Sequence, residues 1–476
     1  MLIGMATFEH LPIRVGGLAE AVTSLAEALS GEDEVFVFMP SHGLISRPGE
    51  LKLEKYADFR ITVGDRIYPI SVYQAWRKGV RLFLLSNEIL DDPNVYHPRD
   101  RFMKKMVHFT KGLPGLVNLI LKKEERKPDL LHINDWHCVF AGSLVKKYFN
   151  IPFIYTIHRI CRERISVQEL NEVNLGELVD NRYLEGDMFN IEVFGAHQCH
   201  YLTTVSYSYL DEEWANFFSS FQGKVTYVWN GIDASFWDSA ALEQAGRPRA
   251  ERRKALLSQN GLADGPFFFN VGRLDAAQKG IDVLLQALEA IMRGETPGAE
   301  RIKDRMRLVL LGSGDPLIES EARRLAERYP ENMKAIIEYL GRETTREFYG
   351  AADFCVIPSN FEPFGLVQME AMCMGCVPIG SRVGGINDTV IDLAAEPRRA
   401  TGLLVPRRNP AALAEAMVQA ALLLEDQPDR VEEMRKNGRT HVIENFSWQR
   451  AAQRYRAVYR NKATLKLPFV SYAEPY

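Results

Sequence analysis

Two cations in the second half of the sequence have the types and spacing to bind an anion together. In VGRLDAAQKG, Arg273 follows an apolar run and Lys279 stands six residues later, beside a glycine. Arginine grips oxygen atoms through its planar fork and lysine acts as a movable point charge, so the pair suits a diphosphate. The alternative is a pair of solvated surface charges, the commoner fate of Arg and Lys. Their position after a predicted strand favours binding.

Two carboxylates, Glu362 and Glu370, stand eight positions apart in NFEPFGLVQMEAMCMGC. Pro363 suits the first turn of a helix and Gly375 its end, so the pattern predicts a largely buried helix between them. Eight residues of helix rise about 12 Å, whereas the acid and base of a glycosidase stand roughly 5 to 10 Å apart. The spacing therefore favours a ligand with hydroxyl groups at both ends of a diphosphate, such as a nucleotide-sugar. The alternative for Glu370 is a helix residue that faces solvent or pairs locally.

A glycine pair near the N-terminus, Gly16 and Gly17 in IRVGGLAEA, precedes the amphipathic pattern GLAEAVTSLAEALS. Backbone N–H groups and a helix dipole at such a site could meet a phosphate. The alternative is a tight turn and nothing more. Cys373 and Cys376 form C-x-x-C with no second pair at metal spacing, and we interpret them as small buried residues.

Short β-branched runs alternate with helical patterns twice along the chain, which predicts parallel sheets covered on both faces. The expected strands are EVFVFMP, RLFLLS, DLLHIND, PFIYTIH, YLTTVS and VTYVWN in the first half, and FFFNVGR, MRLVLLG, KAIIEYL, DFCVIPS, CVPIGS and GLLVP in the second. The fold class is α/β, with two doubly wound, Rossmann-like domains. We place them at residues 1–238 and 239–446, followed by a C-terminal helix and tail at 447–476. Ligands of such sheets bind beyond the carboxyl ends of the strands.

Composition excludes several classes of protein. The 476 residues are 46% hydrophobic and 25% charged, with a formal net charge of -4. This balance argues against broad binding to nucleic acid or anionic membranes. No basic leader and no run of roughly 18 apolar residues is present, and six cysteines fit a reduced compartment. We expect a cytoplasmic protein; monomer and homo-oligomer both stay open.

Seven motifs together resemble one family. In order they are IRVGGLAEA, LHINDWH, TIHR, VWNGID, VGRLDAAQKG, PSNFEPFGLVQMEAM and VGGINDTV. Their order and spacing are similar to those of glycogen and starch synthases, most of all the shorter archaeal glycogen synthases. The resemblance spans nearly the whole chain. It implies a GT-B fold, a retaining glycosyltransferase active site in the cleft between the two domains, and a C-terminal helix, FSWQRAAQRYRAVYR, that returns to the first domain.

The resemblance also implies roles for individual residues. The catalytic group would be Arg273, Lys279, His158 and Glu362, with the two cations neutralising the departing nucleoside diphosphate and the other two at the donor glucose. The other donor-binding residues would be Arg14, Gly16, Gly17, Phe364, Gly365, Leu366 and Glu370, the last at the ribose. Acceptor-side or cleft positions would be Glu9, Asp135, Asn230 and Tyr96.

The implied reaction moves glucose from ADP-glucose or UDP-glucose to the non-reducing end of an α-1,4-glucan, such as glycogen or a maltooligosaccharide, with retention. No D-x-D occurs in the sequence, so we expect neither a metal nor another cofactor. A metal held by His132, Asp135 and His137 is a further, less favoured interpretation. Arg14 stands where the family usually has lysine, and Val367 replaces a common hydroxyl residue, which leaves donor base and acceptor open.

Two rival functions stay open. A retaining glucosyltransferase with a small acceptor, of trehalose-forming or sucrose type, would use the same donor residues. A sugar-nucleotide epimerase or a silent glucan-binding protein would not transfer glucose at all. The complete set of Arg273, Lys279, Glu362 and Glu370 argues against a silent protein.

Overall fold

The structure is a computed structural model that describes residues 1–47, 49–239 and 248–460. By their internal contacts these residues form two compact units. Among the described residues, the first contains Met1–Val205, Glu213–Gly231 and the C-terminal helix Trp448–Arg460; the second contains Ser206–Glu212 and Ile232–Ser447. Residues 206–212 and 232–238, assigned above to the first domain, thus belong to the second unit. The expected tail at 461–476 and the boundary stretch at 240–247 lie outside the described residues.

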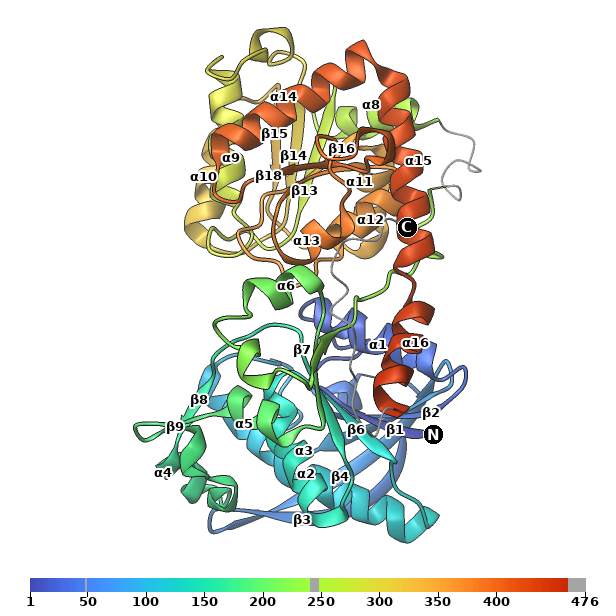
Figure 1. Ribbon diagram of the computed structural model, residues 1–476, viewed down its shortest axis with the longest axis vertical. Coiled ribbons are helices and arrows are strands. Elements are labelled where there is room, and N and C mark those ends of the chain that lie inside the picture. Colours follow the sequence, from blue (N-terminus) through green and yellow to red (C-terminus); the bar gives the residue numbers. More distant parts are fainter. Residues whose placement is uncertain (48, 240–247, 461–476) are drawn as a thin grey trace. The chain divides into compact units, whose positions relative to one another are not determined.

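The first unit is built on a nine-stranded sheet in the order β12-β11-β7-β6-β1-β2-β5-β4-β3 (Figure 1). Its strands are parallel except where β4 pairs with β3 and β5. The bounds are β1 (Leu2–Ala6), β2 (Glu34–Pro40), β3 (Glu54–Val63), β4 (Arg66–Arg77), β5 (Val80–Ser86), β6 (Leu130–Asn134), β7 (Phe153–Ile157), β11 (Tyr201–Thr204) and β12 (Val225–Tyr227). A small antiparallel sheet has β8 (Arg164–Ser166), β9 (Leu184–Glu185) and β10 (Met188–Asn190).

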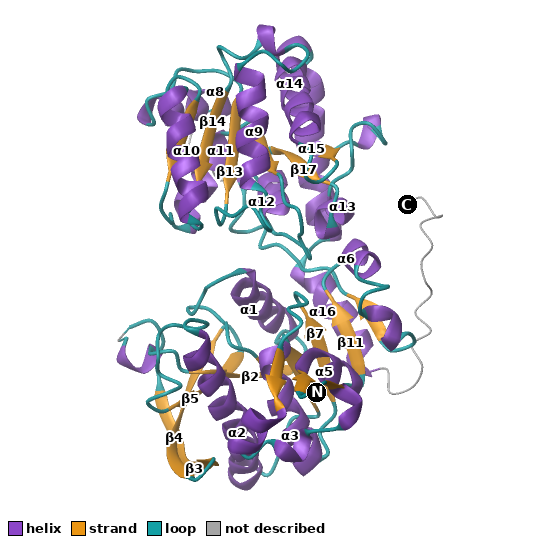
Figure 2. Ribbon diagram, turned by 90° about the vertical axis from the view of Figure 1, so that its left-hand side faces the viewer, coloured by secondary structure: helices purple, strands orange, loops and turns teal. Residues whose placement is uncertain are grey.

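Helices cover both faces of this sheet (Figure 2). Alternate residues of β1 and β2, such as Ile3 and Val35, share one buried cluster with α1 and α16, because successive side chains of a strand face opposite sides. Phe8, which follows β1, contacts Phe109 of α2. The helices are α1 (Gly17–Leu29), α2 (Arg99–Glu124), α3 (Val139–Phe149), α4 (Val167–Glu172), α5 (Ile191–Gln198) and α16 (Trp448–Arg460), with 3₁₀ turns η1 (Leu44–Ser46), η2 (Trp136–Cys138), η3 (Gly176–Leu178), η4 (Asn181–Tyr183) and η5 (Phe218–Phe221).

The C-terminal helix α16 is anchored to the first unit by polar as well as apolar contacts. Arg456 donates to Asp33 at 2.7 Å and to Glu32 at 2.9 Å. The hydroxyl of Tyr459 lies 2.8 Å from His132 Nδ1. A chain that leaves the first unit at Gly231 therefore returns to it at Trp448.

The second unit has a six-stranded parallel sheet in the order β15-β14-β13-β16-β17-β18. Its strands are β13 (Phe267–Val271), β14 (Arg307–Leu311), β15 (Met333–Ile336), β16 (Phe354–Ile357), β17 (Val377–Ser381) and β18 (Leu403–Val405). Its helices are α6 (Tyr207–Glu212), α8 (Arg249–Gln259), α9 (Ile281–Met292), α10 (Pro316–Arg328), α11 (Arg342–Ala351), α12 (Val367–Cys373), α13 (Gly384–Thr389), α14 (Pro410–Asp426) and α15 (Pro428–Asn445), with η6 (Ala299–Arg301) and η7 (Pro397–Arg399).

The two expected doubly wound sheets are confirmed, and every strand named from the sequence is present. The β3–β4 hairpin and the β8–β10 sheet were not expected. Most residues of β3 and β4 are exposed or partly buried and only a few are buried, because these strands lie at or near a sheet edge. They therefore lack the continuous apolar runs on which the strand predictions rested.

Candidate active site

In the second unit, two loops carry the cations and carboxylates singled out above. Strand β13 pairs with β14 on one side and with β16 on the other, so the sheet changes winding direction between β13 and β16. In such sheets the loops at the carboxyl ends of the strands splay apart at this point and leave room for a ligand. Arg273 follows β13 and Glu362 follows β16. The loop after β13, residues 272–280, is called the cation loop below.

Arg273 and Lys279 are both held by Asp275, which lies between them in sequence. Arg273 donates from Nε to Asp275 Oδ2 at 2.7 Å and from Nη2 to Gln278 Oε1 at 2.8 Å. Asp275 Oδ1 accepts the backbone N–H groups of Gln278 at 2.6 Å and Lys279 at 3.1 Å. Burial by itself raises the pKa of Asp275, but these hydrogen bonds and the Arg273 charge lower it overall. The carboxylate is therefore ionised at neutral pH.

Lys279 and Glu362 form an ion pair across the two loops. Lys279 Nζ lies 2.5 Å from Glu362 Oε2, and Ser359 Oγ donates to the same oxygen at 3.3 Å. The Lys279 side chain is 24% exposed and that of Glu362 10% exposed. Screening by water is weak at such burial, so the attraction is stronger than at an open surface. A cation expected at a phosphate and a carboxylate expected at a sugar thus meet directly.

The loop from Glu362 to Leu366 corrects the predicted helix. The sequence predicted a start at Pro363, whereas α12 begins at Val367. Gly365 has φ +78, a left-handed conformation that interrupts a helix. Buried Gln368 holds the turn by donating to the backbone oxygens of Phe364 at 3.0 Å and Gly365 at 2.9 Å. The two carboxylates therefore do not share one helix, and the 12 Å estimate does not apply to them.

A second glycine pair lets this loop approach α13 closely. Gly385 donates its N–H to the backbone oxygen of Glu362 at 3.1 Å. A Cβ on Gly384 would lie 1.9 Å from that oxygen, and a Cβ on Gly385 would lie 2.2 Å from the Phe364 oxygen. Larger residues would displace the backbone that carries Glu362, Phe364 and Gly365. This explains VGGINDTV as a packing motif for the loop.

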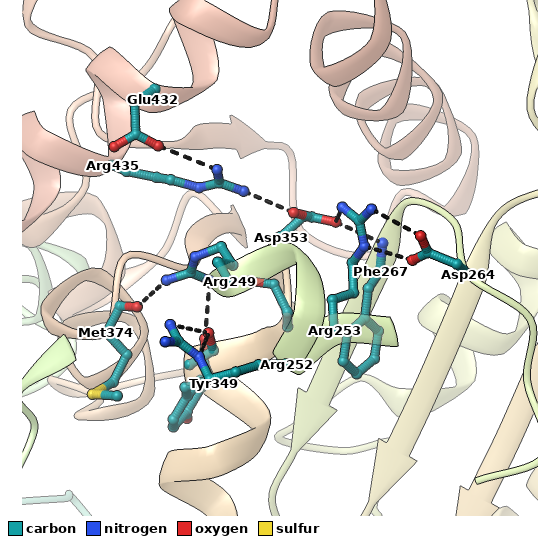
Figure 3. A network of polar contacts seen from close by, with 12 residues as sticks. Arg249, Arg252, Arg253, Asp264, Phe267, Tyr349, Asp353, Met374, Glu432 and Arg435 are labelled. Carbon is teal, nitrogen blue, oxygen red and sulfur yellow. Dashed lines mark hydrogen bonds and ion pairs between the residues drawn. The ribbon is translucent and has the colours of Figure 1, made fainter. Parts of the chain in front are cut away.

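Glu370 lies on α12 and accepts a 3.3 Å hydrogen bond from the Tyr349 hydroxyl. Arg249 of α8 holds the end of this helix (Figure 3). Its guanidinium donates to the backbone oxygens of Ala352, at 2.6 Å, and Met374. Burial lowers the pKa of Arg249 to about 10, so it stays charged at neutral pH. The network in Figure 3 continues through Asp353, which pairs with Arg253 and Arg435.

In the first unit, Glu9 is at the centre of a second cluster, where it bonds to Val15, Gly16 and Tyr96. It follows β1, which pairs with β2 and β6 and so marks the winding change of that sheet. Glu9 Oε2 accepts the backbone N–H groups of Val15 at 2.7 Å and Gly16 at 2.8 Å, and Oε1 accepts the Tyr96 hydroxyl at 2.8 Å. Glu9 is 3% exposed. Its carboxylate therefore braces the loop that enters α1, called the glycine loop below (residues 14–17).

The glycine loop itself is open. Arg14, Gly16 and Gly17 are exposed, and a Cβ on either glycine would meet nothing within 4 Å. Gly16 is the N-cap of α1 with extended backbone and no side-chain cap. The N–H of Gly16 already serves Glu9, which leaves the N–H groups of the first turn of α1 for an anion.

Asp135 and His158 lie together at the ends of β6 and β7. Asp135 Oδ1 accepts the backbone N–H of His158 at 2.8 Å, and His158 Nε2 lies 3.1 Å from Asn134 Oδ1. Burial lowers the pKa of His158 to about 4 and raises the pKa of Asp135 to about 7. His158 is therefore neutral at neutral pH, and Asp135 is close to its midpoint.

The backbone of Asp135 is unusual for a residue with a side chain, with φ 60 and ψ 169. That region is populated almost only by glycine, and such residues cluster at ligand sites because the surrounding structure must hold them there. The Asp135 N–H donates to the Thr156 oxygen at 2.9 Å, which fixes this conformation. Asn230 follows β12 and is partly buried. In the sheet, β11 and β7 separate β12 from β6, the strand that Asp135 follows.

Asp275, Gln278 and Asn134 were not singled out from the sequence. A carboxylate between two cations resembles an ordinary surface residue, and nothing in VGRLDAAQKG shows where it points. The position of Asp275 was one usable signal. An aspartate that accepts the backbone N–H of a residue a few positions later is a common way to close a loop.

No group of three or more His, Cys, Asp or Glu side chains in the described part of the chain is placed to hold a metal ion. All six cysteines are described and none forms a disulfide; Cys373 and Cys376 are buried, as expected. No helix among residues 1–47, 49–239 and 248–460 is long and apolar enough to cross a bilayer.

Comparison with known proteins identifies the family. Residues 2–225 match the starch synthase catalytic domain family, and residues 265–422 match glycosyl transferases group 1. Glycogen synthases of Desulfitobacterium hafniense and Thioalkalivibrio sulfidiphilus are 28% and 29% identical to this chain, over 94% and 95% of it and over 96% and 97% of their own lengths. The chain belongs to the glycogen and starch synthase family.

The family assignment agrees with the fold. The catalytic domain of starch synthase IV from Arabidopsis thaliana, solved with ADP and acarbose, has a TM-score of 0.81 at 22% identity and covers 96% of this chain and 98% of its own. The GT-B fold expected for the family is thereby confirmed. Both glycogen synthases named above are bacterial, so the expected special similarity to archaeal members is not borne out.

Proposed function

We propose that this member of the glycogen and starch synthase family is a glycogen synthase. It transfers glucose from ADP-glucose or UDP-glucose to the non-reducing end of an α-1,4-glucan, with retention of configuration. The match of both family domains and the names of the full-length relatives support this reaction class.

One observation carries the proposal: the Lys279–Glu362 ion pair beside Arg273, where the second sheet changes winding direction. Cleaving the bond between glucose C1 and a phosphate oxygen develops negative charge on the leaving diphosphate. Arg273 and Lys279 stabilise that charge, and cations already in place stabilise it most because they need no reorganisation during the reaction. Lys279 turns from Glu362 to the phosphate when the donor binds, before the bond breaks, and Glu362 then becomes available to accept glucose hydroxyls.

The remaining residues of the two loops complete the donor site. The backbone N–H groups of Phe364 and Gly365, in the turn held by Gln368, bind glucose, with Leu366 alongside. Glu370, which already accepts the Tyr349 hydroxyl, binds the ribose. In the first unit, we assign Arg14 and the N–H groups at the start of α1 to phosphate binding.

Asp135 and His158 serve the sugars. Neutral His158 keeps one ring nitrogen as a hydrogen-bond donor and the other as an acceptor, which suits a hydroxyl. Glu9 and Tyr96, which bond to each other, support the glycine loop. We assign Asn230, like Asp135, to the side of the site that receives the acceptor glucan. The leaving phosphate helps to deprotonate the attacking 4-hydroxyl on the same face of the sugar, and no divalent metal takes part.

The decisive experiment offers labelled ADP-glucose and UDP-glucose separately with glycogen, maltotetraose or glucose, with and without a chelator. We expect α-1,4 linkages on glycogen and maltotetraose, with turnover unchanged by the chelator. Transfer only to glucose or another small acceptor would favour the trehalose-forming or sucrose-type alternative. Loss of activity with chelator, restored by a divalent ion, would refute metal independence while leaving the reaction class intact.

A further inference from the structure

We propose that Asp275 is a positioning residue that orients the guanidinium of Arg273 and fixes the backbone that carries Lys279 before the donor arrives. The proposal rests on the proposed function of Arg273 and Lys279. Asp275 acts through these two residues and through the backbone between them, not by contact with the substrate.

The contact with Arg273 defines the direction of its guanidinium. Asp275 Oδ2 accepts a hydrogen bond from Arg273 Nε, and Gln278 Oε1 accepts one from Arg273 Nη2. These two acceptors fix the planar guanidinium along one edge. The Arg273 side chain is 56% exposed. A long exposed side chain otherwise samples many rotamers, and a fixed one loses less freedom when it binds.

The other oxygen shapes the loop that carries Lys279. Asp275 Oδ1 accepts the N–H groups of Gln278 and Lys279, and the Asp275 backbone oxygen accepts that of Ile281 at 3.2 Å. Gly280 then turns into α9 at φ +62. One residue thus closes the loop from both its side chain and its backbone.

The loop is also tied to the segment that carries Glu362. Asn360 donates its backbone N–H to the Gln278 oxygen at 2.8 Å and its Nδ2 to the Ala276 oxygen at 2.8 Å. Because the loop closed by Asp275 supplies both acceptors, Lys279 and Glu362 are kept in register. Preorganisation of this kind lowers the barrier without adding a contact to the substrate.

The competing interpretation is that Asp275 merely neutralises Arg273 until a phosphate displaces it. The two interpretations predict opposite signs. If Asp275 positions the cations, removing its charge weakens the binding of a nucleoside diphosphate. If it only competes with the phosphate, removing its charge strengthens that binding.

The test compares Asp275→Asn and Asp275→Ala with wild type in calorimetric titrations with ADP and with UDP, and in kcat and KM for the donor. Asparagine can still accept the loop N–H groups but presents an amide to Arg273, whereas alanine removes both contacts. We expect about tenfold weaker diphosphate binding for Asn and a larger loss for Ala. Asp282→Asn, which removes the same charge in the first turn of α9, is the matched control and should change binding less than about twofold.

A double-mutant cycle separates this inference from the proposed function. In an Arg273→Ala background, Asp275→Asn should change kcat/KM by less than about twofold, because its effect is transmitted through Arg273. Unchanged or tighter diphosphate binding by Asp275→Asn, with Arg273→Ala impaired, would overturn the role of Asp275 alone. Normal turnover and diphosphate binding in Arg273→Ala itself would overturn the proposed donor site.

Discussion

In both units a carboxylate that follows a central strand holds the backbone of the loop leading into the next helix. Glu9 accepts the N–H groups of Val15 and Gly16 ahead of α1. Asp275 accepts those of Gln278 and Lys279 ahead of α9. The strands concerned, β1 and β13, are the ones at which each sheet changes winding direction. The two loops are thus built on one local plan.

Their remaining contacts differ. The second oxygen of Glu9 binds the Tyr96 hydroxyl, whereas that of Asp275 binds the Arg273 guanidinium. A Cβ on Gly16 would meet open space, whereas a Cβ on Gly280 would lie 2.2 Å from the Pro358 oxygen. The glycine loop therefore offers an accessible backbone and the cation loop offers fixed charge. A shared turn geometry does not by itself decide which of these a loop supplies.

The largest expected effect tests the charge of the cation loop. Lys279→Ala should lower kcat by about 100- to 1,000-fold, because a preorganised charge facing the leaving group is lost. Arg14→Ala, the corresponding change in the glycine loop, should cost only about tenfold. Steady-state kinetics with the preferred donor measures both.

The control for charge alone is Lys334→Ala, on the exposed side of β15. It should leave turnover unchanged, and all three variants should keep the circular dichroism spectrum of the wild type. Turnover of Lys279→Ala within about threefold of the wild type would remove Lys279 from the mechanism.

The next prediction replaces each N-cap glycine, Gly280 and Gly16, with alanine. Gly280→Ala should lower the free energy of unfolding by about 2 to 4 kcal/mol, because it adds a left-handed alanine and a clash with Pro358. Gly16→Ala should change it by less than about 0.5 kcal/mol, since its φ of -144 is open to any residue. Its effect should appear instead as a higher KM for the donor. Equal destabilisation by the two substitutions would contradict the distinction between the loops.

The smallest expected effect concerns Asp135 in the first unit. Its carboxyl accepts the backbone N–H of His158 and, unlike Asp275, no hydrogen bond from a cation named in this site. Burial raises its pKa from 3.8 to about 7, so the folded chain holds this proton more tightly than the unfolded chain. Stability from this group is present below pH 3.8 and falls as the pH rises to about 7. Asp135→Asn cannot ionise and should therefore exceed the wild type in stability by about 2 kcal/mol at neutral to alkaline pH, after allowance for its partial exposure.

Denaturant unfolding at a series of pH values measures this difference. It should be smallest near the unfolded pKa of 3.8 and level off above about 7. A difference that stays constant across this range would show that Asp135 titrates normally. Asp275→Asn provides the opposite case, because the pKa of Asp275 is lowered and its ionised form stabilises the fold.

Much of the second unit could be predicted from the sequence. Its strands are mostly apolar, since a parallel strand buried on both faces needs apolar residues, and the edge strand β15, with exposed Lys334, is the least buried of them. The β3–β4 hairpin escaped detection because its outer positions are exposed. The helix start at Pro363 was wrong because a favourable N1 residue cannot overcome the left-handed Gly365 two positions later.

The sequence by itself determined which chemical groups are present: which residues carry charge, which can accept hydrogen bonds from hydroxyl groups, and which strand ends they follow. Only the tertiary structure decided their partners. Lys279 and Glu362 are 83 residues apart in sequence and form a pair because β13 and β16 are neighbours in the sheet. Asp275 is a different case, because its partners Arg273, Gln278 and Lys279 lie within four residues of it, and the turn of this one loop brings their donors within hydrogen-bonding distance of its carboxylate.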